Sequence, residues 1–400
     1  MDTKVFSDLK IAAFSWAMVG PLTLKFFADY GATVVRVETS RRPCVTRTSA
    51  PFKDNVPGIN RSGYFNHFSA NMMSVSLDMK SPGGRQVARE LVAWSDVVME
   101  NFTPGVMDAW GLGYEELERI RPGIILVRQN GFGTEGPYRN LAAFGMILAA
   151  VAGIPNYIGW PDGGPLPVGV GAYTDCISPR FASAALIAAL EYRDRTGAGQ
   201  LIDLAQFETA LYYLLPGILD TAANGREPVR SGNAVAYAAP HNVYPCKGEE
   251  RWCTIAVTGD TEWRALCRAV GRPELADDPR FATTPEVMRR QADVLTILDN
   301  AFAEHTLDEW ADVFTTHDIW WDPVQSFEEV VQDPVMREAG VFRPMAGDRT
   351  AIAAPADVTP LRDSIVAPAP ELGQHTEEIL LELGHSWDDI TGLMERGVIP

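Results

Sequence analysis

The chain has 400 residues, of which 46% are hydrophobic and 22% are charged, and its formal net charge is −18. This length exceeds one ordinary hydrophobic core, so we expect two domains in a soluble globular protein. The negative charge argues against nucleic acid or an anionic membrane as a partner, and an anionic ligand would need a local basic patch.

The first part of the chain alternates strand-like and helix-like segments. In chain order, the predicted elements are a strand at 9–14, a helix at 20–30, a strand at 33–37, a helix at 82–94, a strand at 96–99, a helix at 114–120 and a strand at 124–127. This alternation predicts an α/β fold with a doubly wound, mostly parallel (Rossmann-like) sheet, which binds ligands at the carboxyl ends of its strands. No GxGxxG pattern follows the first strand, so we do not expect a dinucleotide cofactor.

One aspartate follows a loop at 153–171 that is rich in glycine and proline. Asp175 precedes a helix-like stretch at 181–190, which ends in the glycine-containing run 193–200. Unpaired N–H groups and the helix dipole keep a carboxylate at a helix N-terminus ionised. Asp175 is therefore either a helix cap or a carboxylate nucleophile that takes an acyl group from a thioester.

The composition changes near residue 222, where we place a domain boundary. The expected organisation is a large domain that begins with 1–222, a smaller α+β domain at 223–335, and a C-terminal segment at 336–400 that returns to the large domain. The elements predicted after the boundary are a loop at 223–247, a strand at 251–257, helices at 262–270, 285–301 and 307–314, an extended Pro-rich segment at 355–370, and a helix at 376–383.

The cysteines and histidines show no metal-ligand spacing. The five cysteines form no CxxC pair and the six histidines are scattered, so we expect no metal site and reduced thiols in a cytosol. The N-terminus lacks a basic region followed by an apolar run, and no apolar stretch is long enough to span a bilayer. We therefore expect a cytoplasmic protein.

Short motifs recur in order along most of the chain. They occupy 20–21, 28–38, 76–85, 100–105, 131–138, 195–200 and 373–376. Together they resemble the class III CoA transferases, the CaiB/BaiF family. The runs 57–65, 172–175 and 320–324 look closest to the branch of succinyl-CoA:benzylsuccinate CoA transferases. The resemblance implies two interlocked subunits, either a homodimer or a heterodimer with a related chain.

The resemblance implies that Asp175 is the nucleophile of a CoA transferase. Its carboxylate would form an anhydride with the donor acyl group and then an aspartyl-CoA thioester, from which CoA passes to the acceptor acid. Coenzyme A thioesters are then substrates, no tightly bound cofactor is needed, and the branch suggests succinyl-CoA as the donor. Glu135 either assists catalysis or is a turn residue.

The resemblance also implies which residues bind CoA and the acyl groups. For CoA they are Arg36, Arg41, Arg42 and Lys80 at the phosphates, and Asn101 and Phe102 at the adenine and pantetheine portions. Each arginine alone is explained as well by a solvated surface. The substrate pocket is expected to include Met18, Gly133 and His241, although a hydrogen-bonded structural role also explains His241.

Some positions depart from the family pattern. Met18 replaces a glutamine of the oxalate/formyl-CoA members, which predicts a bulkier and more apolar acceptor than oxalate unless Met18 is only core packing. Met72, Met73 and Ala109 replace basic residues. Either other arginines compensate, or the chain is the CoA-binding partner subunit of a heterodimeric transferase. Pro179 is expected in the first turn of the helix after Asp175.

A second enzyme class, the α-methylacyl-CoA racemases, shares the implied fold. These enzymes exchange the α-proton with a His/Asp pair. Their histidine would align near Phe144, and no histidine occurs between His67 and His241. Trp320 and Trp321 are adjacent, and adjacent residues of a strand point to opposite faces, so only one of them can face a single core.

Overall fold

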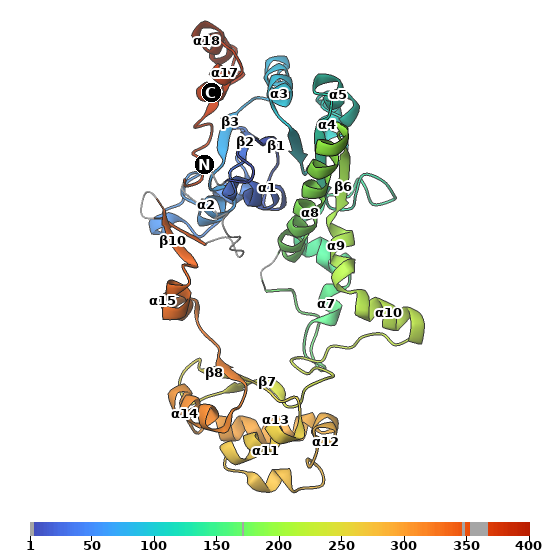
Figure 1. The fold of residues 1–400 in the computed structure, drawn as a ribbon, viewed down its shortest axis with the longest axis vertical. Helices are drawn as coiled ribbons and strands as arrows, with labels where there is room; N and C mark the ends of the chain where they lie inside the picture. Colours follow the sequence, from blue (N-terminus) through green and yellow to red (C-terminus); the bar gives the residue numbers. More distant parts are fainter. Residues whose placement is uncertain (1–3, 170–171, 346–348, 353–366) are drawn as a thin grey trace. The chain divides into compact units, whose positions relative to one another are not determined.

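The computed structural model describes residues 4–169, 172–345, 349–352 and 367–400. The chain forms two compact units (Figure 1). The large unit comprises Met1–Pro155, Pro167–Pro228 and Arg337–Pro400, and the small unit comprises Asn156–Leu166 and Val229–Met336. The segment predicted to be extended at 355–370 lies mostly outside the described residues.

The large unit is built on a six-stranded sheet. Its strands are β1 (Lys10–Phe14), β2 (Thr33–Glu38), β3 (Met73–Ser76), β4 (Val97–Glu100), β5 (Ile125–Asn130) and β6 (Leu201–Ala205). Their order is β3-β2-β1-β4-β5-β6, and every neighbouring pair is parallel. This is the doubly wound order, so the predicted fold class is confirmed. The strand order reverses between β1 and β4, where such folds open a crevice for ligands.

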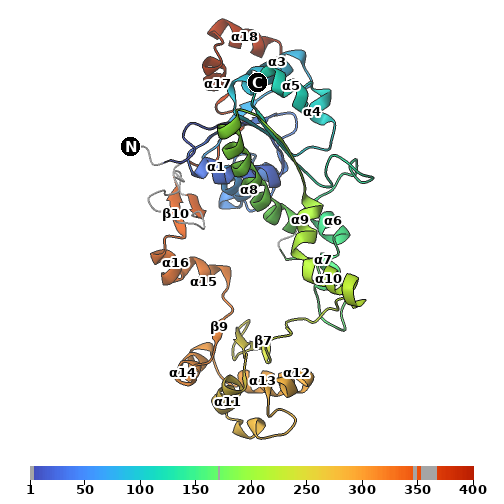
Figure 2. The ribbon, with the colours of Figure 1, turned by 45° about the vertical axis from the view of Figure 1, so that its right-hand side comes forward.

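Helices cover both faces of this sheet. On one face, α1 (Val19–Asp29) and α8 (Tyr173–Thr196) lie side by side, and their Phe27 and Leu186 share a buried core with Ile11 (Figure 2). On the other face, a second core contains Leu91 and Ile379. The helices of this second face are α3 (Pro82–Trp94), α5 (Tyr114–Ile120), α17 (Thr376–Glu382) and α18 (Trp387–Glu395).

Local capping explains why α3 begins where it was predicted. The Ser81 hydroxyl accepts a hydrogen bond from the Gly84 N–H at 2.9 Å, and Pro82 occupies the first helical position, where no N–H is needed.

The other helices of this part of the chain are α2 (Gly63–Ser69), α4 (Val106–Ala109), α6 (Gly145–Val151), α7 (Ile154–Tyr157), α9 (Gln206–Tyr213) and α10 (Leu215–Asn224). An antiparallel hairpin, β10 (Phe342–Met345) and β11 (Arg349–Ile352), follows the small unit.

The small unit contains an antiparallel sheet and its own core. The sheet has the order β7-β8-β9, with β7 (His241–Pro245), β8 (Trp252–Ala256) and β9 (Trp321–Pro323). The helices are α11 (Asp260–Ala269), α12 (Thr284–Arg289), α13 (Gln291–Phe302), α14 (Leu307–His317) and α15 (Phe327–Gln332), with α16 (Pro334–Glu338) at the boundary. Trp321 packs against the core, whereas Trp320 is 64% exposed, so the two tryptophans do face opposite ways.

Two sequence predictions for the second half are wrong. The helix predicted at 285–301 is divided at Arg290, which leaves the helical region at φ −123° and ψ 32°. The segment 223–247 is not all loop, because β7 begins at His241 and pairs with β8. Nowhere in the described ranges does a helix reach the length and apolarity that crossing a bilayer requires.

Candidate active site

A cavity of about 880 Å³ lies in the large unit at the carboxyl ends of the central strands. Residues that directly follow β1, β4 and β5 line it, namely Ser15, Asn101 and Gly131. This is the crevice at the reversal of strand order, where doubly wound sheets bind ligands. Asp175 also lines this cavity, which we call the crevice cavity.

Asp175 lies inside a helix and not before one. The helix α8 begins at Tyr173, and its N-cap residue, Ala172, makes no side-chain cap hydrogen bond. Within the described part of the chain, the Asp175 carboxyl makes no hydrogen bond, so the helix-cap interpretation finds no support there. Burial raises the pKa of Asp175 to about 6. With that pKa, Asp175 is mainly ionised at neutral pH, as the sequence analysis expected.

The position of Pro179 also differs from its prediction. Because α8 begins at Tyr173, Pro179 is its seventh residue and lies beyond the first turn. A helical residue normally donates its N–H to the carbonyl four residues earlier, and proline has no N–H. The backbone carbonyl of Asp175 therefore lacks its intrahelical donor. Val170 and Gly171, which lead to this helix, lie outside the described residues.

The helix α6 approaches the start of α8 closely. A Cβ atom on Gly145 would lie 2.8 Å from the Ala172 Cα, so only glycine fits without a shift. The Thr174 hydroxyl donates to the Gly145 carbonyl at 3.4 Å. Phe144, just before α6, lines the crevice cavity together with Asp175. Phe144 is also the position near which the resemblance placed the histidine of a racemase.

Asn101 joins the two loops at the reversal point. Its side-chain oxygen accepts from the Trp16 N–H at 2.7 Å, and its side-chain nitrogen donates to the Trp16 carbonyl at 2.7 Å. Asn101 and Phe102 both line the crevice cavity, and the Phe102 ring packs edge-on against Trp110. The Asn101 amide thus holds the loop after β1 against the loop after β4.

Exposed cations gather at the edge of the crevice cavity. Arg41, Arg42 and Lys80 were expected there, and all three line it with exposed side chains. Arg41 pairs with Asp78 at 2.9 Å, and Arg42 lies over the Trp16 ring at 4.8 Å. Arg139 is a fourth exposed cation of this lining that the sequence analysis missed. Arg139 directly follows the 131–138 motif, and this position could have indicated that it belongs to the site.

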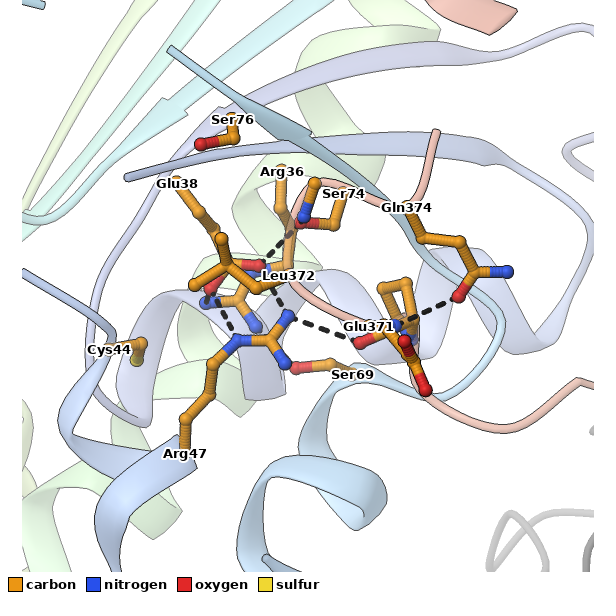
Figure 3. Close-up of polar contacts among 12 residues, drawn as sticks. Arg36, Glu38, Cys44, Arg47, Ser69, Ser74, Ser76, Glu371, Leu372 and Gln374 are labelled. Atoms are coloured by element: carbon orange, nitrogen blue, oxygen red, sulfur yellow. Dashed lines mark hydrogen bonds and ion pairs between the residues drawn. The ribbon is translucent and has the colours of Figure 1, made fainter. Parts of the chain in front are cut away.

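Arg36 belongs to a buried cluster and not to this exposed group. It lines the crevice cavity, but its side chain is fully buried, in contact with the Ser69 hydroxyl and 4.0 Å from a Glu38 oxygen. Arg47 donates to both Glu38 oxygens, at 2.9 and 2.7 Å, and the Ser74 hydroxyl donates to one of them at 2.7 Å. Figure 3 shows Arg36, Arg47 and Ser74 gathered around Glu38.

This buried cluster attaches the C-terminal segment to the sheet. Arg47 also donates to the Pro370 carbonyl at 3.1 Å, and the Ser74 hydroxyl accepts from the Gly373 N–H at 3.0 Å. Burial acts to raise the pKa of Glu38, but the adjacent Arg36 and Arg47 charges and hydrogen bonds outweigh it and hold that pKa below its usual value. Sequence analysis missed Arg47, which no recognised motif contains.

Four expected site residues do not line the crevice cavity, and three of them belong to the large unit. Glu135 is exposed in the turn after β5. The Gly133 N–H donates to the Asn130 side-chain oxygen at 2.6 Å, so this N–H is already engaged. Met18 is the N-cap residue of α1, and its neighbours Ala17 and Val19 line the cavity instead.

His241 lies in the small unit, on β7. Its Nδ1 atom is 2.6 Å from the Asn233 carbonyl oxygen, which is the hydrogen-bonded structural arrangement considered for it. It lines a separate cavity of about 270 Å³ together with Trp320 and Trp321.

Buried polar atoms in the crevice cavity lack partners. Ser15 Oγ, Asn130 Nδ2 and Gln206 Oε1 make no hydrogen bond within the described chain. Each of these residues lines the cavity and is less than 8% exposed. Elsewhere, the described ranges contain no group of three or more histidine, cysteine, aspartate or glutamate side chains that could hold a metal ion.

Comparison with known proteins identifies similar chains. The family model described as CoA-transferase family III matches residues 6–376. A succinyl-CoA–D-citramalate CoA-transferase of Chloroflexus aurantiacus is 31% identical over 397 residues, which cover 98% of this chain and 97% of the relative. A succinate–glutarate CoA-transferase of Agrobacterium fabrum is 31% identical, with 94% of this chain and 95% of the relative covered. The crystal structure of a CaiB/BaiF family protein from Brucella suis matches with a TM-score of 0.87 at 29% identity, covering 94% of this chain and 98% of that one.

Proposed function

Because the chain belongs to CoA-transferase family III, and is therefore a CoA transferase of the CaiB/BaiF class, we propose that it works through covalent intermediates on Asp175. The observation that carries this proposal is a carboxyl group without a hydrogen-bond partner in the described chain, lining a cavity at the ligand-binding edge of the sheet. A helix cap would instead have its oxygens engaged by backbone N–H groups.

The proposed reaction has four steps. The ionised Asp175 carboxylate attacks the donor thioester carbonyl, the C–S bond breaks, and an aspartyl anhydride and CoA thiolate form. The thiolate attacks the aspartyl carbonyl and releases the donor acid as its carboxylate. The acceptor carboxylate then attacks the aspartyl-CoA thioester, which gives a second anhydride and CoA thiolate. Attack of this thiolate on the acceptor carbonyl gives the new acyl-CoA and regenerates Asp175.

The exposed cations support a position for CoA in the crevice. CoA carries several phosphate charges, and the whole chain is strongly negative, so phosphate binding needs a local concentration of positive charge. Arg41, Arg42, Lys80 and Arg139 supply it at the edge of the cavity. Arg139 is a cation beyond those expected, which favours compensation for Met72, Met73 and Ala109 over a partner subunit that binds CoA weakly.

The donor and acceptor follow from the relatives and from the cavity lining. The two relatives described above are named for transfers that involve succinyl-CoA or succinate, so we propose succinyl-CoA as the donor. Phe132, Leu141 and Phe144 give the crevice cavity apolar walls. These walls suit an acceptor acid that is bulkier than oxalate.

The racemase alternative calls for a histidine beside Asp175, and none of the described residues that line the crevice cavity is a histidine. Phe144 lines the cavity, and the racemase histidine was expected near this position. The sequence contains no histidine between His67 and His241. A racemase needs an acid and a base on opposite sides of the α-carbon. The observations on this chain therefore favour CoA transfer.

Intact-protein mass spectrometry tests the proposal. We expect succinyl-CoA to give a mass increase at Asp175 that hydroxylamine removes, and the adduct to be absent in Asp175→Asn. The control is Asp162→Asn, which changes an exposed aspartate outside the crevice cavity. Lack of an adduct with every donor, together with exchange of the α-proton in deuterated water, would favour the racemase. Binding of CoA only after a related chain is added would favour the partner subunit.

A further inference from the structure

One buried amide of the crevice cavity has a hydrogen-bond donor whose identity a hydrogen bond fixes. Asn130, the last residue of β5, is 4% exposed and lines the cavity together with Asp175. The Gly133 N–H donates to one end of the Asn130 amide at 2.6 Å. A backbone N–H can only donate, so that end is the oxygen and the other end is the donor Nδ2. This Nδ2 atom has no hydrogen-bond partner among the described residues.

The turn after β5 keeps the Asn130 amide in this orientation. Gly133 has a φ of 81°, in the left-handed region that favours glycine, and from this conformation its N–H reaches back to Asn130. If the amide exchanged its two ends, two donors would face each other at this short distance. The amide is therefore held in one orientation before any ligand binds.

Asn130 differs from the other amide and from the exposed cations of the crevice cavity. Both ends of the Asn101 amide bond to the backbone of Trp16, so that side chain has no spare donor at its oxygen and is already committed to joining two loops. The four cations proposed for the CoA phosphates are exposed at the edge of the cavity. Asn130 is instead an uncharged, buried donor, and an unpaired buried donor costs free energy unless a ligand pairs with it.

Three elements converge around Asn130 and Asp175. The carbonyl of the residue that follows Asn130 accepts from the Phe207 N–H at 3.0 Å, which ties the end of β5 to the first turn of α9. The hydroxyl groups of Ser178 and Thr209 are 2.7 Å apart and join α9 to α8. Asp175 precedes Ser178 by three residues and so lies on the same face of α8. These contacts place the Asn130 amide and the Asp175 carboxyl in one part of the cavity.

The proposed chemistry needs a donor at the reacting carbonyl group. When a carboxylate attacks a thioester carbonyl, negative charge develops on the carbonyl oxygen. A preorganised N–H group that donates to this oxygen stabilises the charged intermediate more than it stabilises the uncharged thioester, and so it accelerates the reaction. An amide that is fixed in advance and shielded from water meets this requirement.

On the basis of the proposed function, we propose that Asn130 is a catalytic residue whose Nδ2–H donates to the thioester oxygen while Asp175 attacks the carbonyl carbon. As the new C–O bond forms, the π electron pair of the carbonyl moves to its oxygen. When the C–S bond breaks, that pair re-forms the carbonyl group, and the C–S pair leaves on the CoA thiolate. Asn130 neither gains nor loses a proton. The last step of the reaction is this exchange in reverse, on the acceptor acyl group, and uses the same donor.

The test measures how fast Asp175 is modified by succinyl-CoA alone, so that no acceptor acid is involved. Asn130→Asp keeps the oxygen that accepts from Gly133 but replaces the donor Nδ2 with an oxygen. Asn130→Leu removes the donor without adding charge. We expect each variant to slow adduct formation by about a hundredfold or more, followed by rapid quenching and intact-protein mass spectrometry. The affinity for CoA, measured by calorimetry, should stay within about threefold of the wild type, because the donor acts on the intermediate.

A matched control and three outcomes decide the result. Asn224→Leu changes an exposed asparagine whose amide donates to Asp220, and should leave the rate of adduct formation unchanged. An unchanged rate in both Asn130 variants overturns the catalytic role, even if KM for the acceptor acid changes. Parallel losses of rate and of CoA affinity in both variants also overturn it, because they indicate a structural role. Absence of the adduct in the wild type with every donor overturns the proposed function itself.

Discussion

The charge of Asp175 depends on its burial. Burial raises its pKa to about 6, and the proposed nucleophile is the ionised form. Because protonation removes that form, we expect kcat/KM for CoA transfer to fall about tenfold per pH unit below about pH 6 and to be level above it. The measurement is the pH profile of kcat/KM at saturating acceptor. A profile that is flat between about pH 5 and about pH 7 would contradict this assignment.

Arg47 is the residue whose loss should destabilise the large unit most clearly. Arg47 and Glu38 are both buried, and two hydrogen bonds join them. Removal of one partner of a buried ion pair leaves an uncompensated charge. We therefore expect Arg47→Met to lower the free energy of unfolding by about 3–5 kcal/mol, measured by urea denaturation followed by circular dichroism.

A surface ion pair on the same segment gives the matched control. The Arg41 side chain is 64% exposed and pairs with Asp78, so Arg41→Met should change the free energy of unfolding by less than about 1 kcal/mol. Equal effects of Arg47→Met and Arg41→Met would show that burial does not distinguish the two pairs.

At the scale of elements, we expect Pro179 to lower the stability of α8 while it helps to position Asp175. Pro179→Ala supplies an N–H that can bond to the Asp175 carbonyl and change the local geometry of α8. We expect a higher melting temperature, because proline in a helix interior is unfavourable by about 3 kcal/mol relative to alanine. We also expect a roughly tenfold lower kcat, because small displacements of a reacting group are costly. Differential scanning calorimetry and steady-state kinetics measure the two effects.

A proline at a helix start provides the comparison for that prediction. Pro82 is the first residue of α3, where no N–H is needed, so Pro82→Ala should change neither kcat nor the melting temperature appreciably. If Pro179→Ala raises the melting temperature and leaves kcat unchanged, the proline does not position Asp175.

Elements with strong local signals were predicted from the sequence, whereas β6, which has no such signal, was not. The segments 82–94 and 114–120 match α3 and α5 because capping and helical periodicity are local properties. The strand β6 was missed because its mostly exposed and half-buried side chains do not form a buried apolar run. Its identity as a strand depends on pairing with β5, more than seventy residues earlier in the chain.

The residues of the candidate site also differ in how far the sequence predicted them. Asp175, Arg41, Arg42 and Lys80 were expected from motifs that contain them or lie near them, and all four line the crevice cavity. That Ala205 and the following Gln206 lie beside Asn130 was not predicted, because β5 and β6 come together only in the folded sheet. The start of α8 at Tyr173 was placed too late, since glycines before Asp175 and Pro179 after it resemble the end of a loop.

The charge of the whole molecule predicts opposite salt effects on stability and on ligand binding. At a formal net charge of −18 the folded chain repels itself, and salt screens that repulsion within about 10 Å at 0.1 M. We therefore expect the melting temperature to rise between low salt and about 0.5 M NaCl. The affinity for CoA should fall over the same range, because salt also screens the attraction between its phosphates and Arg41, Arg42, Lys80 and Arg139. Calorimetry measures both effects on one sample.

The double variant Arg41→Gln with Arg42→Gln should bind CoA more weakly and with a smaller salt dependence, while its melting temperature keeps the wild-type salt dependence. Loss of affinity without any change in salt dependence would place these two arginines outside the phosphate contacts.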